Sequence, residues 1–434
     1  MIALAIDVGA SSGRLILSFQ EDGRPILKEV YRFQTPLIHN ADHFFWDVEG
    51  LLREMIVGLK KVKEGGIFPE RIGIDTFGVD YALLDDKGVL LAPVSSYRDE
   101  RTIAAKANFL SPETIFQETG IQPQSFDTVY QLAADQASGI LPRAKQLLFL
   151  PSYLAYRLTG VLQNERSIIS TSGLFDGRSN DYSPRLLGAL HLTKAFFAPL
   201  VEAGTCIGPF KKEIADEVGF SAQVYAALEH DTASAFYGSG SKTHEVLISS
   251  GTWSLLGSIV GEPIVTSETY QAGFTNELSH KNEVRFLKNV TGMWMVNRLM
   301  KESPVSRPIA QVVGMARDGR DYLGYFDATD ERLLNPDDMK AELLSLLRER
   351  HFALPKNEAE LYYSVFHSLA RSYALAIQQM SRLTGQNFSA IRIFGGGSKN
   401  ELLNELTSAE SRLPVFRGPV EATALGNIRS IIQL

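Results

Sequence analysis

Cysteine is almost absent from this chain, and so are segments that would carry it into or across a membrane. One cysteine, Cys206, among 434 residues rules out an internal disulfide and fits a reducing compartment. No apolar run reaches the roughly 18 residues that a membrane helix needs. The N-terminus lacks a basic region and Asp7 interrupts its short apolar run. We therefore expect no signal peptide and a cytoplasmic location.

An excess of positive charge is also missing. The chain has 43 Lys and Arg against 50 Asp and Glu, which gives a net charge of −7. We therefore do not expect nucleic acid as a main partner. The lack of a long apolar run, noted above, is the reason to expect no membrane partner. The hydrophobic content of 44% is that of an ordinary globular protein, and 434 residues are too many for one core, so two or three domains are expected.

Two common nucleotide motifs are missing as well. The chain contains no Gly-Lys dipeptide, which excludes a Walker A loop. Residues 9–13, Gly-Ala-Ser-Ser-Gly, imitate a dinucleotide fingerprint, but such a loop should open a helix and residues 15–19 favour a strand. No Tyr-x-x-x-Lys pair exists to support the chemistry of short-chain dehydrogenases.

Three glycine-rich turns are the most informative feature present. They cover residues 7–14, 249–254 and 394–400, and the first two each lie between apolar runs. This pattern predicts strand, tight polar turn and strand, twice, about half a chain apart. Glycine lets backbone N–H groups approach an anion, and Ser and Thr add hydroxyl donors. Two such turns facing each other would hold a polyphosphate such as ATP, although an ordinary hairpin explains any single turn equally well.

The first half is expected to be alternating α/β structure. Strands are predicted at 2–7, 13–19, 26–33 and 72–75, a helix over 48–63 and a hairpin over 79–91, followed by a mostly helical, irregular stretch over 100–225. The helix carries one apolar stripe, formed by Leu51, Leu52, Met55, Ile56, Leu59 and Val62.

The second half restarts with the strand at Val246. A long helix is predicted over 362–384, with Gly385 as its C-cap, and a short buried strand over 391–394 leads into the third turn. Residues 238–241, Gly-Ser-Gly-Ser, indicate a hinge or linker. We therefore expect one domain over 1–238 and a second over 239–434.

Several motifs, in order along the chain, resemble those of the FGGY carbohydrate kinases. Besides the turns, they are 72–80 (IGIDTFGVD), 97–102 (YRDERT), 230–235 (HDTASA), 288–294 (KNVTGMW) and 418–428 (GPVEATALGNI). The resemblance spans essentially the whole chain. It implies an α/β fold of two actin-like, ribonuclease H-like ATPase domains around an interdomain cleft.

The resemblance implies that Asp231 is the general base. A sugar hydroxyl has a very high pKa, so a carboxylate beside it assists its attack on the γ-phosphorus of ATP. The local sequence also suits Asp231 as the N-cap of a helix beginning at Thr232, and the two roles are compatible.

The resemblance places ATP and Mg²⁺ at the turns. Asp7 would hold Mg²⁺, commonly through water, since Mg²⁺ is bound by few carboxylates plus phosphate oxygens; a strand-end Asp that caps a turn is the simpler alternative. Asn297 stands where the family carries a Gln that contacts the nucleotide, and it is one methylene shorter. The implied nucleotide contacts are Ala10, Ser11, Ser12, Gly13, Arg14, Thr252, Asn297 and Gly396.

The implied sugar contacts are Gly78, His230, Asp231, Thr232 and Asn289. Asn289 is chemically apt because an amide both donates to and accepts from hydroxyls. His230 is equally well explained as a satisfied, semi-buried histidine, Asn289 as a turn residue, and Phe77 either stacks on the sugar or belongs to the core.

The resemblance thus implies an ATP-dependent kinase for a 2-ketose or a similar deoxysugar. The matches at 10–14, 78, 230–234 and 289 favour L-rhamnulose, phosphorylated at O1, with L-fuculose, xylulose or another polyol as alternatives. A catalytically silent sugar or ATP sensor on the same fold is the alternative from another class. The presence of both Asp7 and Asp231 argues against a sensor, which has no need of a base.

Overall fold

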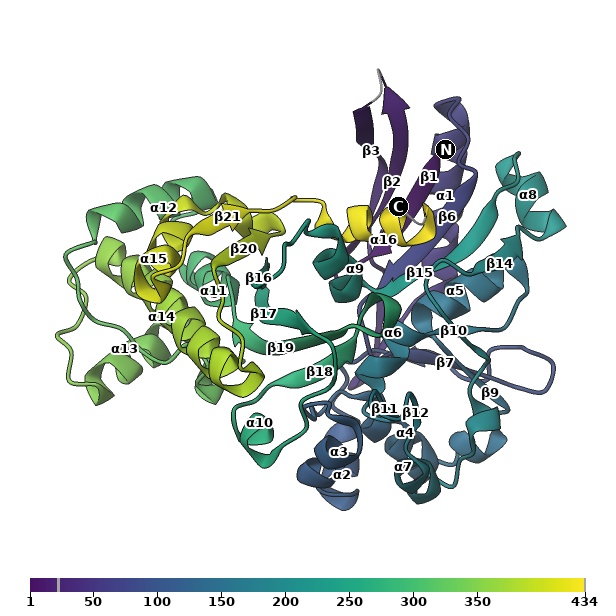
Figure 1. Cartoon of the computed structure of the whole chain (residues 1–434), viewed down its shortest axis with the longest axis horizontal. Helices are drawn as coiled ribbons and strands as arrows, with labels where there is room; N and C mark the ends of the chain where they lie inside the picture. The colour runs from purple at the N-terminus through teal and green to yellow at the C-terminus, as the bar shows by residue number, and fades with distance from the viewer. Residues whose placement is uncertain (22–23, 433–434) are drawn as a thin grey trace.

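Two six-stranded sheets organise the computed structural model, which describes residues 1–21 and 24–432 (Figure 1). The first sheet has the order β3 (Arg24–Gln34), β2 (Ser12–Glu21), β1 (Ala3–Val8), β6 (Arg71–Thr76), β15 (Gln223–His230) and β14 (Cys206–Pro209). All six residues of β1 are buried, as expected for a central strand covered on both faces. The predicted strands at 2–7, 13–19, 26–33 and 72–75 are confirmed with small shifts of their ends.

The second sheet repeats the pattern of the first. Its order is β18 (Thr275–Leu278), β19 (Val284–Thr291), β17 (Trp253–Val260), β16 (Glu245–Ser250), β20 (Ala390–Phe394) and β21 (Val415–Arg417). β1 pairs antiparallel with β2 and parallel with β6. β16 likewise pairs antiparallel with β17 and parallel with β20. The strand–turn–strand unit that the sequence predicts twice is therefore present twice, at the centre of each sheet.

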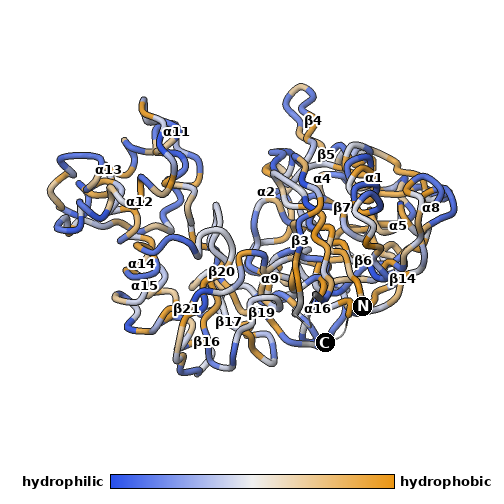
Figure 2. Tube along the Cα trace, turned by 90° about the horizontal axis from the view of Figure 1, so that it is seen from above, coloured by the Kyte–Doolittle hydropathy of each residue, from blue (hydrophilic) through white to orange (hydrophobic). Residues whose placement is uncertain are grey.

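Helices cover the faces of both sheets. In the first half they are α1 (Val48–Glu64), α2 (Thr102–Asn108), α3 (Pro112–Thr119), α4 (Thr128–Ala137), α5 (Leu150–Thr159), α6 (Arg166–Ile169), α7 (Pro184–Ala189), α8 (Lys212–Val218) and α9 (Asp231–Gly238). In the second half they are α10 (Ser267–Gln271), α11 (Trp294–Glu302), α12 (Ile309–Asp318), α13 (Met339–Glu349), α14 (Glu358–Thr384), α15 (Glu401–Ser411) and α16 (Ala422–Ile432). Seen from above, apolar segments gather around β3 and β6, whereas polar segments mark the outer helices such as α13 (Figure 2). No helix within residues 1–21 and 24–432 has the length and apolar character to cross a membrane.

The two predicted long helices form because their ends are well capped. α1 begins after Asp47, whose Oδ1 accepts a hydrogen bond of 2.8 Å from Gly50 N, and its predicted stripe is buried apart from the partly buried Leu52. α14 starts four residues earlier than predicted because Asn357 Oδ1 caps Glu360 N at 2.9 Å. It ends at Gly385 in the left-handed conformation, with φ of 68°.

The last helix returns from the second half to the first sheet. α16 packs against α9 and against β1, β6 and β15 (Figure 1). The crossing is close because glycine stands on both helices: a Cβ on Gly238 would lie 1.9 Å from the Ala422 carbonyl oxygen, and one on Gly426 would lie 1.7 Å from that of Ser234. Only glycine allows this approach.

The predicted hairpin over 79–91 is only partly right. The chain does turn at Asp85, but its return contributes a single bridge, between Leu84 and Leu90. The full partner of β7 (Tyr81–Leu84) is β9 (Gln146–Phe149). β7 is buried throughout and needs an apolar partner, which β9 supplies, whereas Val89 on the predicted arm is 58% exposed.

The remaining strands form small pairs and ribbons. They are β4 (Leu37–Asn40), β5 (His43–Trp46) and β8 (Val94–Ser95) in one sheet, β10 (Asn164–Glu165) with β13 (Leu200–Val201), and β11 (Phe175–Asp176) with β12 (Asp181–Tyr182). The stretch 100–225 contains α2 to α8 with short strands between them. It is therefore mostly helical and irregular, as predicted.

Candidate active site

Two buried carboxyl groups lie side by side near the ends of β1 and β6. Asp7 and Asp75 are paired in the parallel register of these strands, and they are 6% and 0% exposed. Burial raises the pKa of Asp75 well above its usual range, and the Asp7 carboxylate raises it further. Burial also raises the pKa of Asp7, against the opposing effect of Arg14, and the Asp231 carboxylate adds to the rise. Asp231 therefore acts on both groups electrostatically, and the three acids share one region.

Asp75 was not predicted as a site residue, although the sequence motif contains it. Asn427 Nδ2, on α16, donates to Asp75 Oδ2 at 2.5 Å, while the buried Oδ1 has no hydrogen-bond partner in the described chain. The available signals were an acid in the apolar run Ile-Gly-Ile-Asp and an amide in the apolar helix Ala-Leu-Gly-Asn-Ile. A buried oxygen without a partner is a place for water or a cation.

Arg14 joins the acids to the second half of the chain. Its Nη2 and Nε each lie 2.9 Å from Asp7 Oδ2, and its Nη1 forms an ion pair with Glu421, the residue before α16. Glu421 also was not predicted. In this structure the Arg14 guanidinium is therefore occupied by two carboxylates.

Asp231 begins α9 without capping it. The N-cap residue is His230, no side chain caps the helix, and the Asp231 carboxylate is 31% exposed. The alternative that Asp231 serves as the N-cap of a helix starting at Thr232 is therefore wrong. Its Oδ1 instead accepts a hydrogen bond of 3.1 Å from Thr232 Oγ1, and the rest of the carboxylate is free for other chemistry.

His230 ends β15 and touches the second sheet. Its side chain is 11% exposed, with Nε2 3.4 Å from Asp231 Oδ1. On the other side of the ring, Nδ1 lies 3.2 Å from Arg285 Nη2 and 3.3 Å from Glu277 Oε2. His230 is thus both semi-buried and in contact with the candidate base.

Gly78 lies in a tight turn after β6. Asp80 N donates to the Gly78 carbonyl at 2.9 Å, and Val79 between them has φ of 69°, which is rare and strained for a β-branched residue. Thr171 Oγ1 accepts from Val79 N at 3.1 Å, and Thr128 Oγ1 donates to the Val79 carbonyl at 2.6 Å, so buried hydroxyls hold the turn. Such strain persists where the surroundings enforce it, often at a ligand site.

Phe77 belongs to the core rather than to an exposed surface. It is 7% exposed and its ring centroid lies 4.6 Å from that of Trp46 and 5.5 Å from that of Tyr97. The exposed Arg98 lies over Trp46 and Tyr97, and its Nη2 donates to the Ala10 carbonyl in the first turn at 3.1 Å. This contact links the turn after β1 to the neighbourhood of Gly78.

The second and third glycine turns form another group. Trp294 N, at the start of α11, donates to the Thr252 carbonyl at 2.9 Å. A Cβ on Gly397, next to Gly396, would lie 2.0 Å from Ser250 Oγ, so the third turn packs on the second. Thr252, Gly396, Asn289 and Asn297 are all exposed, on the turns, on β19 and on α11. Ser11 is exposed in the first turn, where Ala10, Ser12 and Arg14 are partly buried and Gly13 is buried.

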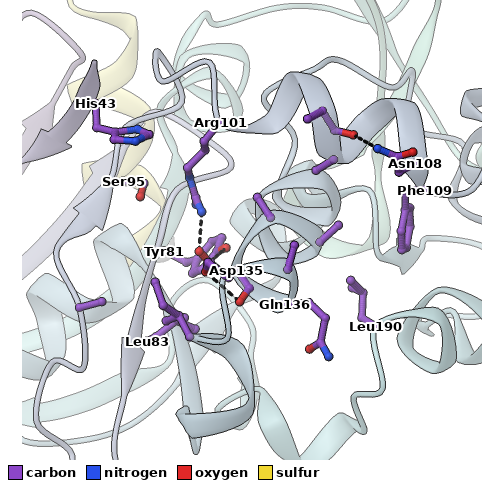
Figure 3. A pocket seen from close by; sticks show the side chains of 18 of the residues that line it. His43, Tyr81, Leu83, Ser95, Arg101, Asn108, Phe109, Asp135, Gln136 and Leu190 are labelled. Atoms are coloured by element: carbon purple, nitrogen blue, oxygen red, sulfur yellow. Dashed lines mark hydrogen bonds and ion pairs between the residues drawn. The ribbon is translucent and has the colours of Figure 1, made fainter. Parts of the chain in front are cut away.

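A separate cavity of about 730 Å³ lies in the helical part of the first half. Figure 3 shows Arg101 and Tyr81 meeting Asp135 at its base, where Tyr81 Oη donates to Asp135 Oδ2 at 2.6 Å. None of the residues predicted for the site lines this cavity. The candidate site is therefore elsewhere, around β1, β6 and the start of α9.

The acids at β1 and β6 suit a hard cation. No group of three His, Cys, Asp or Glu side chains among the described residues could enclose a metal ion. Asp7 and Asp75 nevertheless offer carboxylate oxygens on adjacent strands, one of them buried without a partner. Mg²⁺ typically takes one or two carboxylates and completes its shell with water and phosphate oxygens, so the donor set fits it.

The chain belongs to the FGGY family of carbohydrate kinases and is a sugar kinase. The family models for the N-terminal and C-terminal domains match residues 2–238 and 246–430. Among similar proteins, the rhamnulokinase of Bacillus subtilis is 36% identical over 433 residues, which cover 99% of this chain and 89% of that protein. The rhamnulokinase of Enterococcus faecalis is 37% identical, over 98% of this chain and 87% of that protein.

Solved structures of sugar kinases share the two-domain α/β fold. A ligand-bound xylulose kinase from Lactobacillus acidophilus superposes with a TM-score of 0.83 at 16% identity, covering 100% of this chain and 89% of that one. A xylulose kinase from Rhodospirillum rubrum gives a TM-score of 0.80 at 14% identity, covering 99% and 90%. The predicted α/β fold class with two domains is therefore confirmed.

Proposed function

We propose that the enzyme transfers the γ-phosphoryl group of ATP to O1 of L-rhamnulose, yielding L-rhamnulose 1-phosphate and ADP. The substrate rests on the two rhamnulokinases that are 36% and 37% identical over nearly the whole chain. The observation that carries the chemistry is the carboxylate of Asp231, which is partly exposed and caps no helix.

Asp231 is the proposed general base. It takes the proton of the sugar hydroxyl as that oxygen attacks phosphorus, a role that requires a carboxylate with a free oxygen near the substrate. Gly78, His230, Thr232 and Asn289 are proposed to fix the sugar. Two features support this assignment. The strained turn at Val79 follows β6, which carries Asp75, and the uncapped helix α9 begins with Asp231.

The glycine turns are proposed to hold the nucleotide. Backbone N–H groups of the first turn, with Ser11 and Ser12, would bind phosphate oxygens together with Thr252, while Gly396 and Asn297 would lie on the adenosine side. Asp7, with Asp75 beside it, would hold Mg²⁺, which supplies positive charge between the phosphate oxygens. Arg14 has its guanidinium on Asp7 and Glu421, so we propose that it contributes by fixing Asp7.

We also propose that the enzyme works in the cytoplasm. Its one cysteine, Cys206, is exposed, and an exposed free thiol is best preserved in a reducing compartment.

The decisive experiment compares kcat/KM for L-rhamnulose, L-fuculose, L-xylulose and D-xylulose in a coupled assay of ADP release. L-Rhamnulose should give the highest value, because a wrong epimer leaves polar groups unpaired at a cost of about 1–3 kcal/mol each. If the kcat/KM of another ketose is tenfold higher, L-rhamnulose is not the preferred substrate, although the protein is still a kinase. If ATP binds and none of these four sugars stimulates ADP release, L-rhamnulose is not the substrate.

A further inference from the structure

A buried arginine of the second sheet reaches the histidine beside Asp231. Arg285 on β19 stands directly opposite Glu277 on β18, and it is fully buried. Its Nη2 lies 3.1 Å from Glu277 Oε2 and 3.2 Å from His230 Nδ1. The guanidinium also donates to the Leu278 carbonyl, through Nε at 3.1 Å and Nη2 at 3.0 Å. Its orientation is therefore set by its own sheet.

The contact with Arg285 assigns the tautomer of His230. His230 Nδ1 meets both a donor, Arg285 Nη2 at 3.2 Å, and an acceptor, Glu277 Oε2 at 3.3 Å, but only the contact with Arg285 has the geometry of a hydrogen bond. A guanidinium offers only N–H donors, so Nδ1 accepts and the ring proton then resides on Nε2. Nε2 is the nitrogen that faces Asp231 Oδ1, at 3.4 Å. Thr232 Oγ1 donates to the same oxygen at 3.1 Å. Thr232 thus donates to Oδ1 and His230 Nε2 faces it at ion-pair distance, whereas no group in the described part of the chain donates to Oδ2.

The edge of the second sheet that carries Arg285 is fastened to the first half. Ser170 Oγ accepts from Leu278 N at 2.9 Å, and Asn276 Nδ2 donates to the Gly120 carbonyl at 2.9 Å. Thr275 Oγ1 accepts from Gln122 N at 3.1 Å. These bonds fasten β18, the neighbour of β19, to residues 120–122 and to Ser170 of the first half. They therefore support the contact between Arg285 and His230, which come from different sheets.

We propose that Arg285, held by Glu277, is a positioning residue for the catalytic base. It keeps the His230 proton on Nε2, which holds Asp231 Oδ1 and leaves Oδ2 to receive the proton of the sugar hydroxyl. As that proton moves, the sugar oxygen bonds to the γ-phosphorus, and the bond from this phosphorus to the β–γ bridging oxygen of ATP breaks. The inference rests on the proposed role of Asp231 as the base.

Replacement of the pair tests the effect on turnover. In Arg285→Met/Glu277→Gln both charges are removed, so that neither is left buried and unpaired. We expect kcat to fall about 10- to 100-fold, as for a displaced catalytic group, with an unchanged KM for ATP. The matched control is Arg392→Met/Glu245→Gln, which removes the ion pair between β20 and β16, with its bonds of 2.7 and 2.9 Å. This pair lies in the same sheet as Arg285, and no contact between it and His230 is found among the described residues. It should lower stability and leave kcat unchanged. A folded Arg285 variant with normal kcat overturns the inference.

Nitrogen-15 NMR of enzyme labelled at its histidines tests the tautomer of His230 directly. The measurement uses the unmodified protein, so it does not depend on a variant that could fail to fold. The His230→Gln variant identifies the His230 signals. We expect an unprotonated Nδ1 and a protonated Nε2 in the unmodified enzyme, and a change of this pattern in Arg285→Met/Glu277→Gln. A proton on Nδ1 in the unmodified enzyme overturns the inference whatever the kinetics. Full activity of Asp231→Asn would instead overturn the proposed base, which makes the two failures distinguishable.

Discussion

The two sheets share a strand pattern but surround their buried carboxyl groups differently. In the first half, burial raises the pKa values of Asp7, Asp75 and Glu165, that of Asp80 to about 6, and that of Glu229 to about 8. In the second half, burial opposes the ionisation of Glu245 and Glu277, but hydrogen bonds from Arg392 to Glu245 and the charge of Arg285 beside Glu277 outweigh it, and their pKa values are lowered. Repetition of a fold therefore did not repeat its electrostatics.

The central turns show the same contrast. With Gly9 aligned on Gly251, the position of Asp7 in β1 corresponds to Ser249 in β16. Asp75 in β6, paired with Asp7, corresponds to Phe394 in β20, which is paired with Ser249. The first half concentrates acids, and the second offers hydroxyl and backbone groups. This division suits a base and a cation on one side and phosphate donors on the other.

The largest effect is expected from Asp231→Asn, which tests whether the acids of the first half perform the chemistry. Loss of the base should lower kcat by roughly 10²–10⁴-fold. Fold and nucleotide affinity should persist, because the carboxylate caps no helix and is partly exposed. A steady-state assay measures kcat. Calorimetry of ATP binding and thermal unfolding serve as controls for nucleotide affinity and folding. Near-normal turnover would remove Asp231 from the mechanism.

The pH dependence of stability provides the next test of the contrast. Glu229 accepts hydrogen bonds from Ser152 and from Gln163 Nε2, the latter at 3.1 Å, and its pKa of about 8 exceeds the ordinary value of 4.5. The folded state thus keeps a proton that the unfolded chain releases. The stabilising effect of this proton is full below about pH 4.5 and is lost as the pH rises towards 8, by at most about 5 kcal/mol.

Glu229→Gln should weaken the fall in unfolding free energy between pH 5 and pH 9, measured in urea, because the amide stays neutral. Each unit of pKa shift corresponds to about 1.4 kcal/mol. Glu245→Gln is the matched control with the opposite sign. The pKa of Glu245 is lowered, so its contribution is present above its unfolded pKa and fades as the pH falls through its folded value. Parallel curves for the Glu229 variant and the unmodified enzyme would contradict the assignment.

The sequence predicted the elements well because their signals are local. Apolar runs that flank glycine turns indicated both central hairpins, and a 3–4 spacing ended by Gly385 indicated α14. Contacts between distant segments were not predictable in this way. β7 pairs with β9 some sixty positions later rather than with its neighbour. Asn427 reaches Asp75 across 352 positions and Arg285 reaches His230 across 55. Neither periodicity nor turn chemistry carries such information, so Asp75, Glu421 and the Arg285–Glu277 pair were missed.

The smallest effect concerns the crossing of α9 and α16, where the two halves meet most closely. Gly426→Ala places a Cβ 1.7 Å from the Ser234 carbonyl oxygen, and Gly238→Ala places one 1.9 Å from that of Ala422. Each should lower the free energy of unfolding by about 1–3 kcal/mol, because backbone must move to admit the methyl group. Gly314→Ala on the exposed face of α12 meets no atom within 4 Å and should instead raise it by up to about 1 kcal/mol. The urea midpoints of all three variants measure these changes.

The contacts of Gly238 and Gly426 mirror each other, so similar losses of unfolding free energy would show that the two halves depend equally on the crossing. If only one of the two substitutions lowers the free energy of unfolding, the two helices contribute unequally to the crossing. The similarity of the two halves would then be limited to their sheets.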